Sequence, residues 1–312
     1  MASSPLRSKS YHARSVSLPS RTRPLIPQFD DHLCRLNASS EATTSSLLSI
    51  SNTISGLENV YDCVDELLRL PHTQQRLGQE CNEKSVEEVL DGYLRLLDAC
   101  VATKDIFSLT KEDVKEQHSN LRRKRDASDF GGYIASRKKA KKVILKLLND
   151  LKCIKHKDIL RGLSLDKSHG TIAIFSMLKE VEIVTFCALE SLLCYASGRK
   201  VQSRRSGWSL VSRLMHHERA ACQAKETVVS EFANIDAAIR VLVGHQPIKS
   251  VHNKNIERVQ NQLGELELSI QDAEEVLERL LRRLIRTRVS LLNILTFSIT
   301  RLENPGAESS YL

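Results

Sequence analysis

The sequence has few aromatic residues, few turn-forming residues and no closely spaced pair of cysteines. Aromatics make up 4% of the 312 residues, and there are only 12 glycines and 7 prolines. A β-sandwich draws on aromatic strands and frequent turns, so this composition disfavours it and suits long helices. None of the eight cysteines forms a CxxC pair, which is the spacing that zinc and redox sites favour. We therefore expect reduced cysteines packed on helix faces.

Catalytic signatures are also lacking. The sequence contains no P-loop, no GxGxxG, no GxSxG and no HExxH pattern. His216 and His217 are adjacent, and on a helix they would point about 100° apart, which is poor geometry for chelating one metal ion. We predict no catalytic, cofactor-binding or metal-binding residues, and hence a non-enzymatic protein.

The most apolar run, residues 171–196, is interrupted by charges. Lys179, Glu180 and Glu182 lie near its middle, where charges make a membrane-spanning helix costly. This run predicts a buried helix instead. Residues 1–29 lack the apolar core of a secretory signal. We expect a cytoplasmic protein, peripheral to a membrane if it binds lipid, with plastid and nucleus as alternatives.

The net charge of +8 is concentrated in two regions. Residues 1–29 carry five basic residues and no acid, and residues 122–142 carry nine basic residues against two acids. Subtracting these +5 and +7 leaves −4 for the rest of the chain. The protein is therefore a near-neutral body with two basic segments, rather than a uniformly basic chain.

Apolar residues recur with helical spacing along most of the sequence. From Leu47 to Leu68 they step alternately by three and four residues, and Pro71 is expected to end this helix. Ser85 and Glu88 match a capping box, which predicts the start of a second helix. The further helices that we predict lie at about 85–107, 110–125, 128–154, 171–196 and 208–243.

The segment 256–298 has the most regular pattern. Its apolar seam keeps alternating three- and four-residue spacing, typical of a coiled-coil-like helix, and apolar residues beside the seam, such as Ile285 and Val289, suggest a broad buried face. Glu275 and Glu278 stand four residues before Arg279 and Arg282, the favourable order for intrahelical ion pairs. The seam can pair within the chain or join two copies, and the intramolecular pairing is favoured because other helices also need apolar partners. The seam positions are Ile256, Val259, Leu263, Leu266, Ile270, Ala273, Leu277, Leu280, Leu284, Thr287, Leu291, Ile294 and Ser298.

These patterns predict an all-α fold, an elongated bundle of about six to seven helices with a long C-terminal helix. Residues 1–30 are expected to be a disordered basic tail, because they have too little apolar content to offset the entropy of ordering. Residues 31–303 are expected to form a single helical domain, followed by a short flexible tail at 304–312.

A phosphorylation motif lies in the N-terminal segment. In "RSVSLP", Arg14 precedes Ser17 by three residues and Pro19 follows it by two. An arginine at this spacing suits a basophilic kinase, and the resulting phosphate suits the arginine cluster of a 14-3-3 groove. We predict Arg14, Ser17 and Pro19 as a regulatory docking motif, with an unmodified tail as the alternative.

The basic block at 121–145 consists of two clusters. With Ala140 as reference on a helical wheel, Tyr133, Ile144 and Leu151 fall on one side. The lysines on the opposite side are Lys138, Lys139, Lys142 and Lys146, whereas Lys141 and Lys152 lie on the flank. Four interpretations remain: a solvated helix face, an anionic lipid contact, a nuclear address and a nucleic-acid patch. Nucleic acid is the least favoured because no aromatic residues interleave with the lysines. The candidate contacts to an anionic surface are Arg122, Arg123, Lys124, Arg125, Lys138, Lys139, Lys142 and Lys146.

Several sequence blocks resemble the Bypass-related plant proteins. They are "DELLRLPHTQQRL" (65–77), "KDIFSLTKEDVKEQHSNLRRKR" (104–125), "YIASRKKAKK" (133–142) and "LERLLRRLIRTRVSLLNILTF" (277–297), and "HARSVSLPSRTRPLIPQFDDHLCRL" (12–36) resembles the family's N-terminal segment. The resemblance implies a plant-specific, mostly helical protein associated with root and shoot development. It implies no catalytic residues.

Together, these observations predict a helical interaction or regulatory protein whose protein partner the sequence does not name. The alternatives are a peripheral membrane adaptor that binds anionic lipid through the basic helix face, and a nuclear factor.

Overall fold

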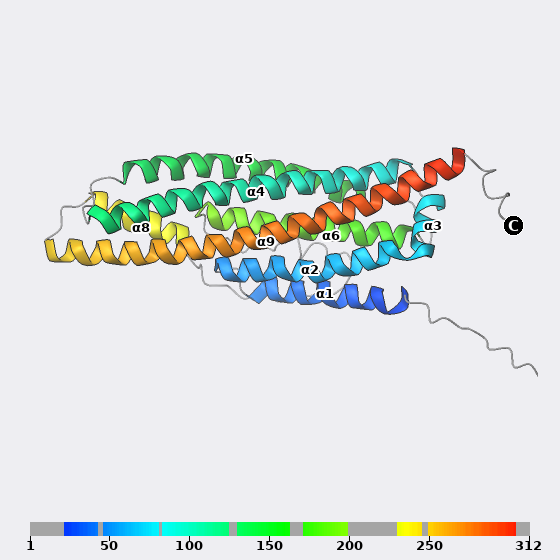
Figure 1. Cartoon of the computed structure of the whole chain (residues 1–312), viewed down its shortest axis with the longest axis horizontal. Coiled ribbons are helices and arrows are strands. Elements are labelled where there is room, and N and C mark those ends of the chain that lie inside the picture. Colours follow the sequence, from blue (N-terminus) through cyan, green and yellow to red (C-terminus); the bar gives the residue numbers. More distant parts are fainter. Residues whose placement is uncertain are drawn as a thin grey trace, which may run out of the picture.

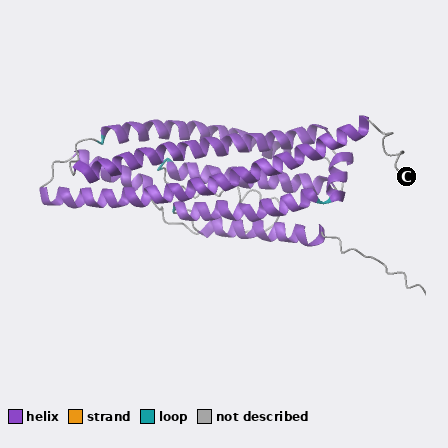
Figure 2. Cartoon of the chain, in the orientation of Figure 1, coloured by secondary structure: helices purple, strands orange, loops and turns teal. Residues whose placement is uncertain are grey.

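The computed structural model describes residues 22–42, 46–80, 83–124, 130–162, 171–198, 230–244 and 249–303, and this part of the chain is an elongated bundle of helices (Figure 1). No strand occurs in these ranges (Figure 2), so the predicted all-α fold is confirmed, with eight helices where about six to seven were expected. The helices are α1 (Thr22–Ala42), α2 (Leu47–Arg69), α3 (Pro71–Glu80), α4 (Glu83–Lys124), α5 (Gly131–Gly162), α6 (Thr171–Ala196), α8 (Glu231–Gly244) and α9 (Lys249–Glu303).

Helix α9 runs nearly the whole length of the bundle (Figure 1). At 1.5 Å per residue its 55 residues span about 80 Å. Every predicted seam position from Ile256 to Ile294 is buried, and the side chain of Ser298 lies outside the described set. The seam packs against α2, α3, α4 and α8 of the same chain. Dimerisation through it would therefore require exchange of helices between copies.

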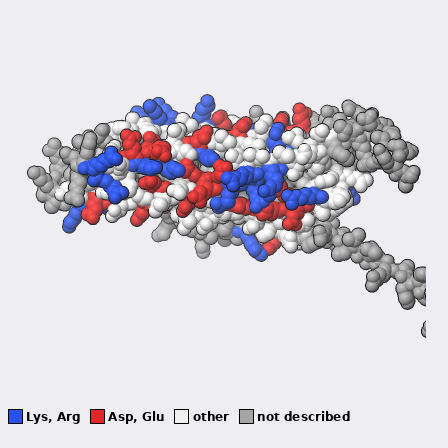
Figure 3. All heavy atoms as spheres, in the orientation of Figure 1, with Lys and Arg blue, Asp and Glu red and all other residues white. Residues whose placement is uncertain are grey.

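Ion pairs flank the seam on both sides. Lys104 and Lys111 of α4 pair with Glu278 and Glu274, so α4 runs antiparallel to α9. On the other side, the Arg279 Nε lies 2.8 Å from the Glu58 Oε1 of α2. Arg279 thus binds a neighbouring helix instead of the predicted Glu275, whereas the predicted Glu278–Arg282 pair is present at 3.5 Å. Figure 3 shows acidic and basic side chains interspersed along this face.

Ile285 and Val289 do not extend the buried face. They are 48% and 47% exposed, while Leu281 is partly buried against the core. Because α2 and α4 flank the seam, residues farther around α9 face solvent. The expectation of a broad buried face is wrong at Ile285 and Val289.

Helix α4 is continuous where two helices were predicted. Thr110 was expected to open a new helix, but its Oγ1 donates to the carbonyl of Ile106 at 2.7 Å inside an unbroken helix. Val114 and Leu121 continue the buried side beyond it. The predicted cap at Ser85 is also wrong, because α4 already begins at Glu83.

The N-terminal boundary also differs from the prediction. Residues 22–30, assigned to a disordered tail, belong to α1, which buries Leu25, Phe29 and Leu33 against the bundle. Pro24 falls in the first turn, where backbone N–H groups have no intrahelical acceptor, so it is compatible with a helix start. Pro71 comes after the end of α2, as predicted. It is also the first residue of α3, a helix that was not predicted, and a proline is well tolerated at that position.

Some predictions fall wholly or partly outside the described residues. These are the 14-3-3 motif (Arg14, Ser17, Pro19), Arg125, the adjacent histidines, the tail at 304–312 and most of the predicted helix at 208–243, of which α8 forms the C-terminal part.

No described helix has an apolar stretch long enough to span a membrane. No disulfide joins the described cysteines; Cys63, Cys100 and Cys187 are buried, but Cys34 and Cys153 are exposed, contrary to expectation.

The charges that interrupt α6 form part of a buried polar layer. Glu182 is fully buried and lies 2.9 Å from the Lys179 Nζ and 3.6 Å from the Arg95 Nη2 of α4. Its carboxylate packs directly against Gly92, where a Cβ would lie 2.3 Å from the nearest oxygen. Nearby, Tyr61 and Thr185 share a buried hydrogen bond of 2.8 Å. The close approach of α4 to α6 therefore depends on the absence of a side chain at position 92.

We expect Gly92→Ala to lower the free energy of unfolding by about 1–3 kcal/mol, because the new methyl group displaces a buried, ion-paired carboxylate. The matched control is Gly132→Ala on α5, where a Cβ meets no atom within 4 Å. In this control the free energy of unfolding should stay unchanged or rise by up to about 1 kcal/mol, because alanine has a better helix propensity than glycine. Urea unfolding followed by circular dichroism measures both, and equal effects would contradict the steric argument.

Candidate functional site at the α5 and α8 surface

Helix α5 has one side in the bundle and the other in solvent. Tyr133, Ile144 and Leu151 are buried, as the helical wheel predicted. Arg137 is buried with them, and only 3% of its side chain is exposed. Four exposed lysines of α5 form a surface that we call the α5 face, which consists of Lys138, Lys139, Lys142 and Lys146.

The two basic clusters of the sequence belong to consecutive helices. Arg122 and Arg123 are exposed at the end of α4, whose last residue is Lys124, and α5 begins at Gly131. Helices α4 and α5 lie side by side (Figure 1). A nuclear import receptor binds an extended segment, whereas the described parts of both clusters are helical.

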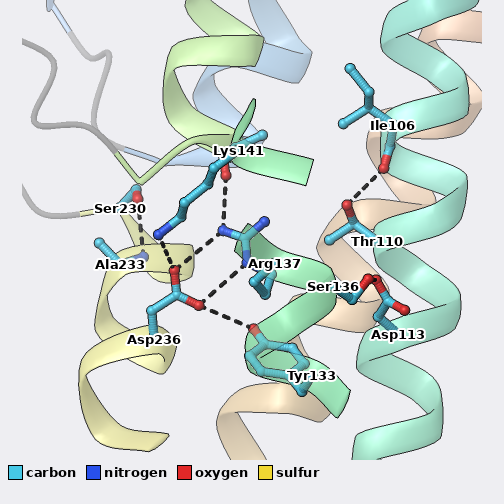
Figure 4. A network of polar contacts seen from close by, with 11 residues as sticks. Ile106, Thr110, Asp113, Tyr133, Ser136, Arg137, Lys141, Ser230, Ala233 and Asp236 are labelled. Atoms are coloured by element: carbon cyan, nitrogen blue, oxygen red, sulfur yellow. Dashed lines mark hydrogen bonds and ion pairs between the residues drawn. The ribbon is translucent and has the colours of Figure 1, made fainter. Parts of the chain in front are cut away.

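A buried ion-pair network joins α5 to α8 (Figure 4). The Arg137 Nε lies 3.3 Å from the Asp236 Oδ1, and the Lys141 Nζ lies 2.6 Å from the Asp236 Oδ2. The Tyr133 hydroxyl donates to the Asp236 Oδ1 at 3.4 Å. Arg137 also donates to the carbonyl of Ala196, the last residue of α6, at 3.0 Å. One carboxylate therefore holds three side chains of α5 and indirectly ties α6 to the same point.

The Arg137 guanidinium stacks on an aromatic ring. Its Cζ lies 4.7 Å from the centroid of Phe232, one turn before Asp236 on α8. Phe232 in turn packs edge-on against Phe107 and Tyr195. Because the ring and the carboxylate hold the guanidinium from two directions, Arg137 has little rotational freedom.

The electrostatics of the network favour an ionised carboxylate. Burial by itself raises the pKa of Asp236, but Arg137 and Lys141 outweigh it and hold the pKa below 3.8. Burial raises the pKa of the Tyr133 hydroxyl, which therefore stays protonated and donates its hydrogen bond. At neutral pH the network carries one negative and two positive charges, a net charge of +1.

A cleft of about 320 Å³ opens beside this network, between α5 and α8. Asp236 is the only acidic residue among those that line it. We call this the α5/α8 cleft, and its lining residues are Tyr133, Ile134, Arg137, Lys138, Lys141, Lys142, Leu145, Asp236, Ile239 and Arg240.

Arg137, Asp236 and Arg240 were not predicted as site residues from the sequence. A signal was present, because Arg137 lies only about 60° from the centre of the apolar side of its helix. Asp236 similarly borders the buried stripe of α8, which contains Phe232 and Ile239. A cation and an acid on the apolar sides of two helices each need a buried partner, which marks both residues as site candidates but does not show that they pair with each other.

Asp236 of this network and Asp65 of α2 are both buried, but their carboxylates differ in how they affect stability. Asp236→Asn leaves Arg137 buried beside a neutral amide, so we expect a loss of roughly 2–4 kcal/mol in the free energy of unfolding at neutral pH. Asp65 of α2 is the matched control, because burial raises its pKa despite its 2.9 Å hydrogen bond from Thr287 and the Arg286 guanidinium 3.7 Å away. Asp65→Asn removes a carboxylate whose charge opposes folding, so we expect a change below about 1 kcal/mol.

The pH dependence follows from the lowered pKa of Asp236. Its stabilising contribution is present above the unfolded pKa near 3.8 and is lost as the pH falls through the lower folded value. The stability difference between wild type and Asp236→Asn should shrink below that pH. Urea midpoints from pH 7 downward measure this, and a difference independent of pH would argue against an ionised Asp236.

The comparisons with known proteins agree with the resemblance seen in the sequence. No curated protein and no solved structure matches the chain significantly. The described residues contain no cluster of metal-ligating side chains. The family model described as Protein BPS1 matches residues 53–294, which covers α3, α4, α5, α6 and α8 and most of α2 and α9. Because this match extends over well more than half of the sequence, the chain belongs to the Bypass-related, or BPS1, family.

Proposed function

We propose that this protein is a non-enzymatic helical interaction protein that takes part in plant development by presenting the α5 face to a protein partner. The Bypass-related family is associated with root and shoot development, and membership supports the developmental part of the proposal. The interaction part is supported by the geometry of α5.

The observation that carries the proposal is the two-sided character of α5. Its inner side is tied to α8 and α6 through Arg137 and Asp236, which limits movement of the helix. Its outer side carries four exposed lysines that have no ion-pair partner among the described residues. A rigid row of cations without partners favours recognition of an acidic surface, because little conformational entropy of the backbone is lost on binding.

A peripheral membrane adaptor is the second candidate function. Arg122 and Arg123 at the end of α4 add two exposed cations to the lysines of α5. Basic residues near an anionic membrane surface contribute about 1 kcal/mol each, so a cluster of this size is enough for reversible attachment. This function requires binding to anionic vesicles that weakens as the salt concentration rises.

Proximity labelling in plant cells tests the protein-partner proposal. We expect a variant with Lys138, Lys139, Lys142 and Lys146 changed to Glu to lose a defined subset of labelled proteins, because charge reversal repels an acidic partner. The control reverses four exposed basic residues on α3, α4 and α9, namely Arg76, Lys115, Lys254 and Arg258. It should retain that subset. Identical labelling by wild type and the α5 variant would refute the proposal.

Phosphorylation of Ser17 is a second route to a partner, because a phosphate there would create a ligand for the arginine cluster of a 14-3-3 protein. We expect Ser17→Ala to abolish capture of 14-3-3 from plant extract, and neighbouring Ser15→Ala to leave it intact. A pull-down with both variants measures this. Undiminished capture by Ser17→Ala would show that the motif is not the docking site.

A further inference from the structure

The α5/α8 cleft has an uneven distribution of charge. Five cationic side chains line it, and Asp236 is the only carboxylate. Arg137 and Lys141 already share that carboxylate. Lys138, Lys142 and Arg240 are exposed and have no ion-pair partner among the described residues. Three cations at the rim are thus left for an external anion.

The inner wall of the cleft is rigid and partly apolar. Ile134, Leu145 and Ile239 contribute to its lining together with the stems of the basic side chains. Arg137 is held beneath by Asp236, Ala196 and the Phe232 ring, and its buried Nη1 has no hydrogen-bond partner within the described part of the chain. The buried Arg137 therefore fixes the wall beneath the rim, and this part of the cleft needs little reordering when a ligand binds.

The size of the cleft restricts the ligand. At about 320 Å³ it lies at the lower end of the range of about 300–1,000 Å³ that is usual for small-molecule sites. It suits a compact ring rather than a helix of a partner or a whole lipid. The apolar lining can contact the face of such a ring, while the three rim cations reach separate anionic groups at its edge.

We propose that the α5/α8 cleft binds a small cyclic polyphosphate, of the inositol phosphate type, through Lys138, Lys142 and Arg240. The source is either a soluble inositol phosphate or the headgroup of a membrane phosphoinositide, which share this chemistry. This site goes beyond the protein interaction proposed above, because it uses a cleft and needs no protein partner. Its test in purified components is independent of whether the α5 face recruits proteins in cells.

Calorimetric titration of the full chain with inositol trisphosphate tests the site. Changing Lys138, Lys142 and Arg240 together to Gln should weaken binding by about tenfold or more, because each hydrogen bond between charged partners is worth at least about a tenfold change in affinity. The matched control changes three exposed lysines of α5 outside the cleft to Gln, namely Lys139, Lys146 and Lys152. It removes the same charge and should weaken binding by less than about threefold, through long-range attraction alone.

A vesicle arm identifies the source of the ligand. Wild type is sedimented with phosphatidylcholine vesicles that carry either phosphatidylinositol bisphosphate or phosphatidylserine at equal total charge. The rim variant is the one with Lys138, Lys142 and Arg240 changed to Gln. If wild type and the control prefer the phosphoinositide vesicles and the rim variant does not, the site binds a lipid headgroup. Equal binding to both vesicle types, together with tight binding of soluble trisphosphate, assigns it to a soluble ligand.

Two results would overturn the proposal. One is the absence of trisphosphate binding by wild type together with no preference for phosphoinositide vesicles. The other is an equal loss of binding in the rim variant and the control variant, which would mean that the whole basic surface attracts anions and the cleft does not select them. Circular dichroism and thermal unfolding of both variants establish that they are folded, and the mutated side chains are all exposed.

Discussion

The buried seam of α9 is the constraint on which the rest of the bundle depends. Its apolar residues supply the surface against which α2, α3, α4 and α8 pack. Among the described side chains of this seam, Thr287 is the polar exception, and its Oγ1 donates to Asp65 of α2 at 2.9 Å. Apolar contacts alone would allow neighbouring helices to slide by a turn. Polar contacts at fixed positions along the helix axis, such as this one and the Arg279–Glu58 pair, favour a single alignment of α2 against α9.

The same alignment places the basic side chains of the candidate site. Helix α8 packs against the first half of α9, and α4 packs against both α9 and α5. Asp236 of α8 can therefore meet Arg137 and Lys141 of α5 only when each helix pairs correctly with its neighbours. The cleft and the α5 face thus depend on the core, although their charged side chains are at the surface.

Sequence periodicity predicted the parts of the fold that depend on one helix at a time. The seam of α9, the position of α6 and the division of α5 into a buried and an exposed side all follow from apolar spacing. The continuity of α4 through Thr110 was missed because a threonine followed by acids resembles a helix start, whereas here its hydroxyl bonds within the helix. The start of helix α1 was missed because residues 1–30 were judged as one segment of low apolar content, although Leu25, Phe29 and Leu33 recur at four-residue spacing near its end. Pairing between helices is harder to infer, since spacing along α5 does not reveal that Asp236 lies opposite Arg137.

The position of α9 at the end of the described chain has a consequence for synthesis. Arg279 and Arg283 bind residues of α2 that precede them by 221 positions. The ribosome therefore exposes α2, α4 and α8 before the helix that covers them exists. Until α9 is synthesised, the apolar sides of these helices lack their common partner and are only loosely packed. Contacts between residues this far apart in the sequence form late, and partly folded chains are prone to aggregation. A chain interrupted before α9 would lack the common surface of the bundle, so the synthesis of α9 governs whether the earlier helices stay packed.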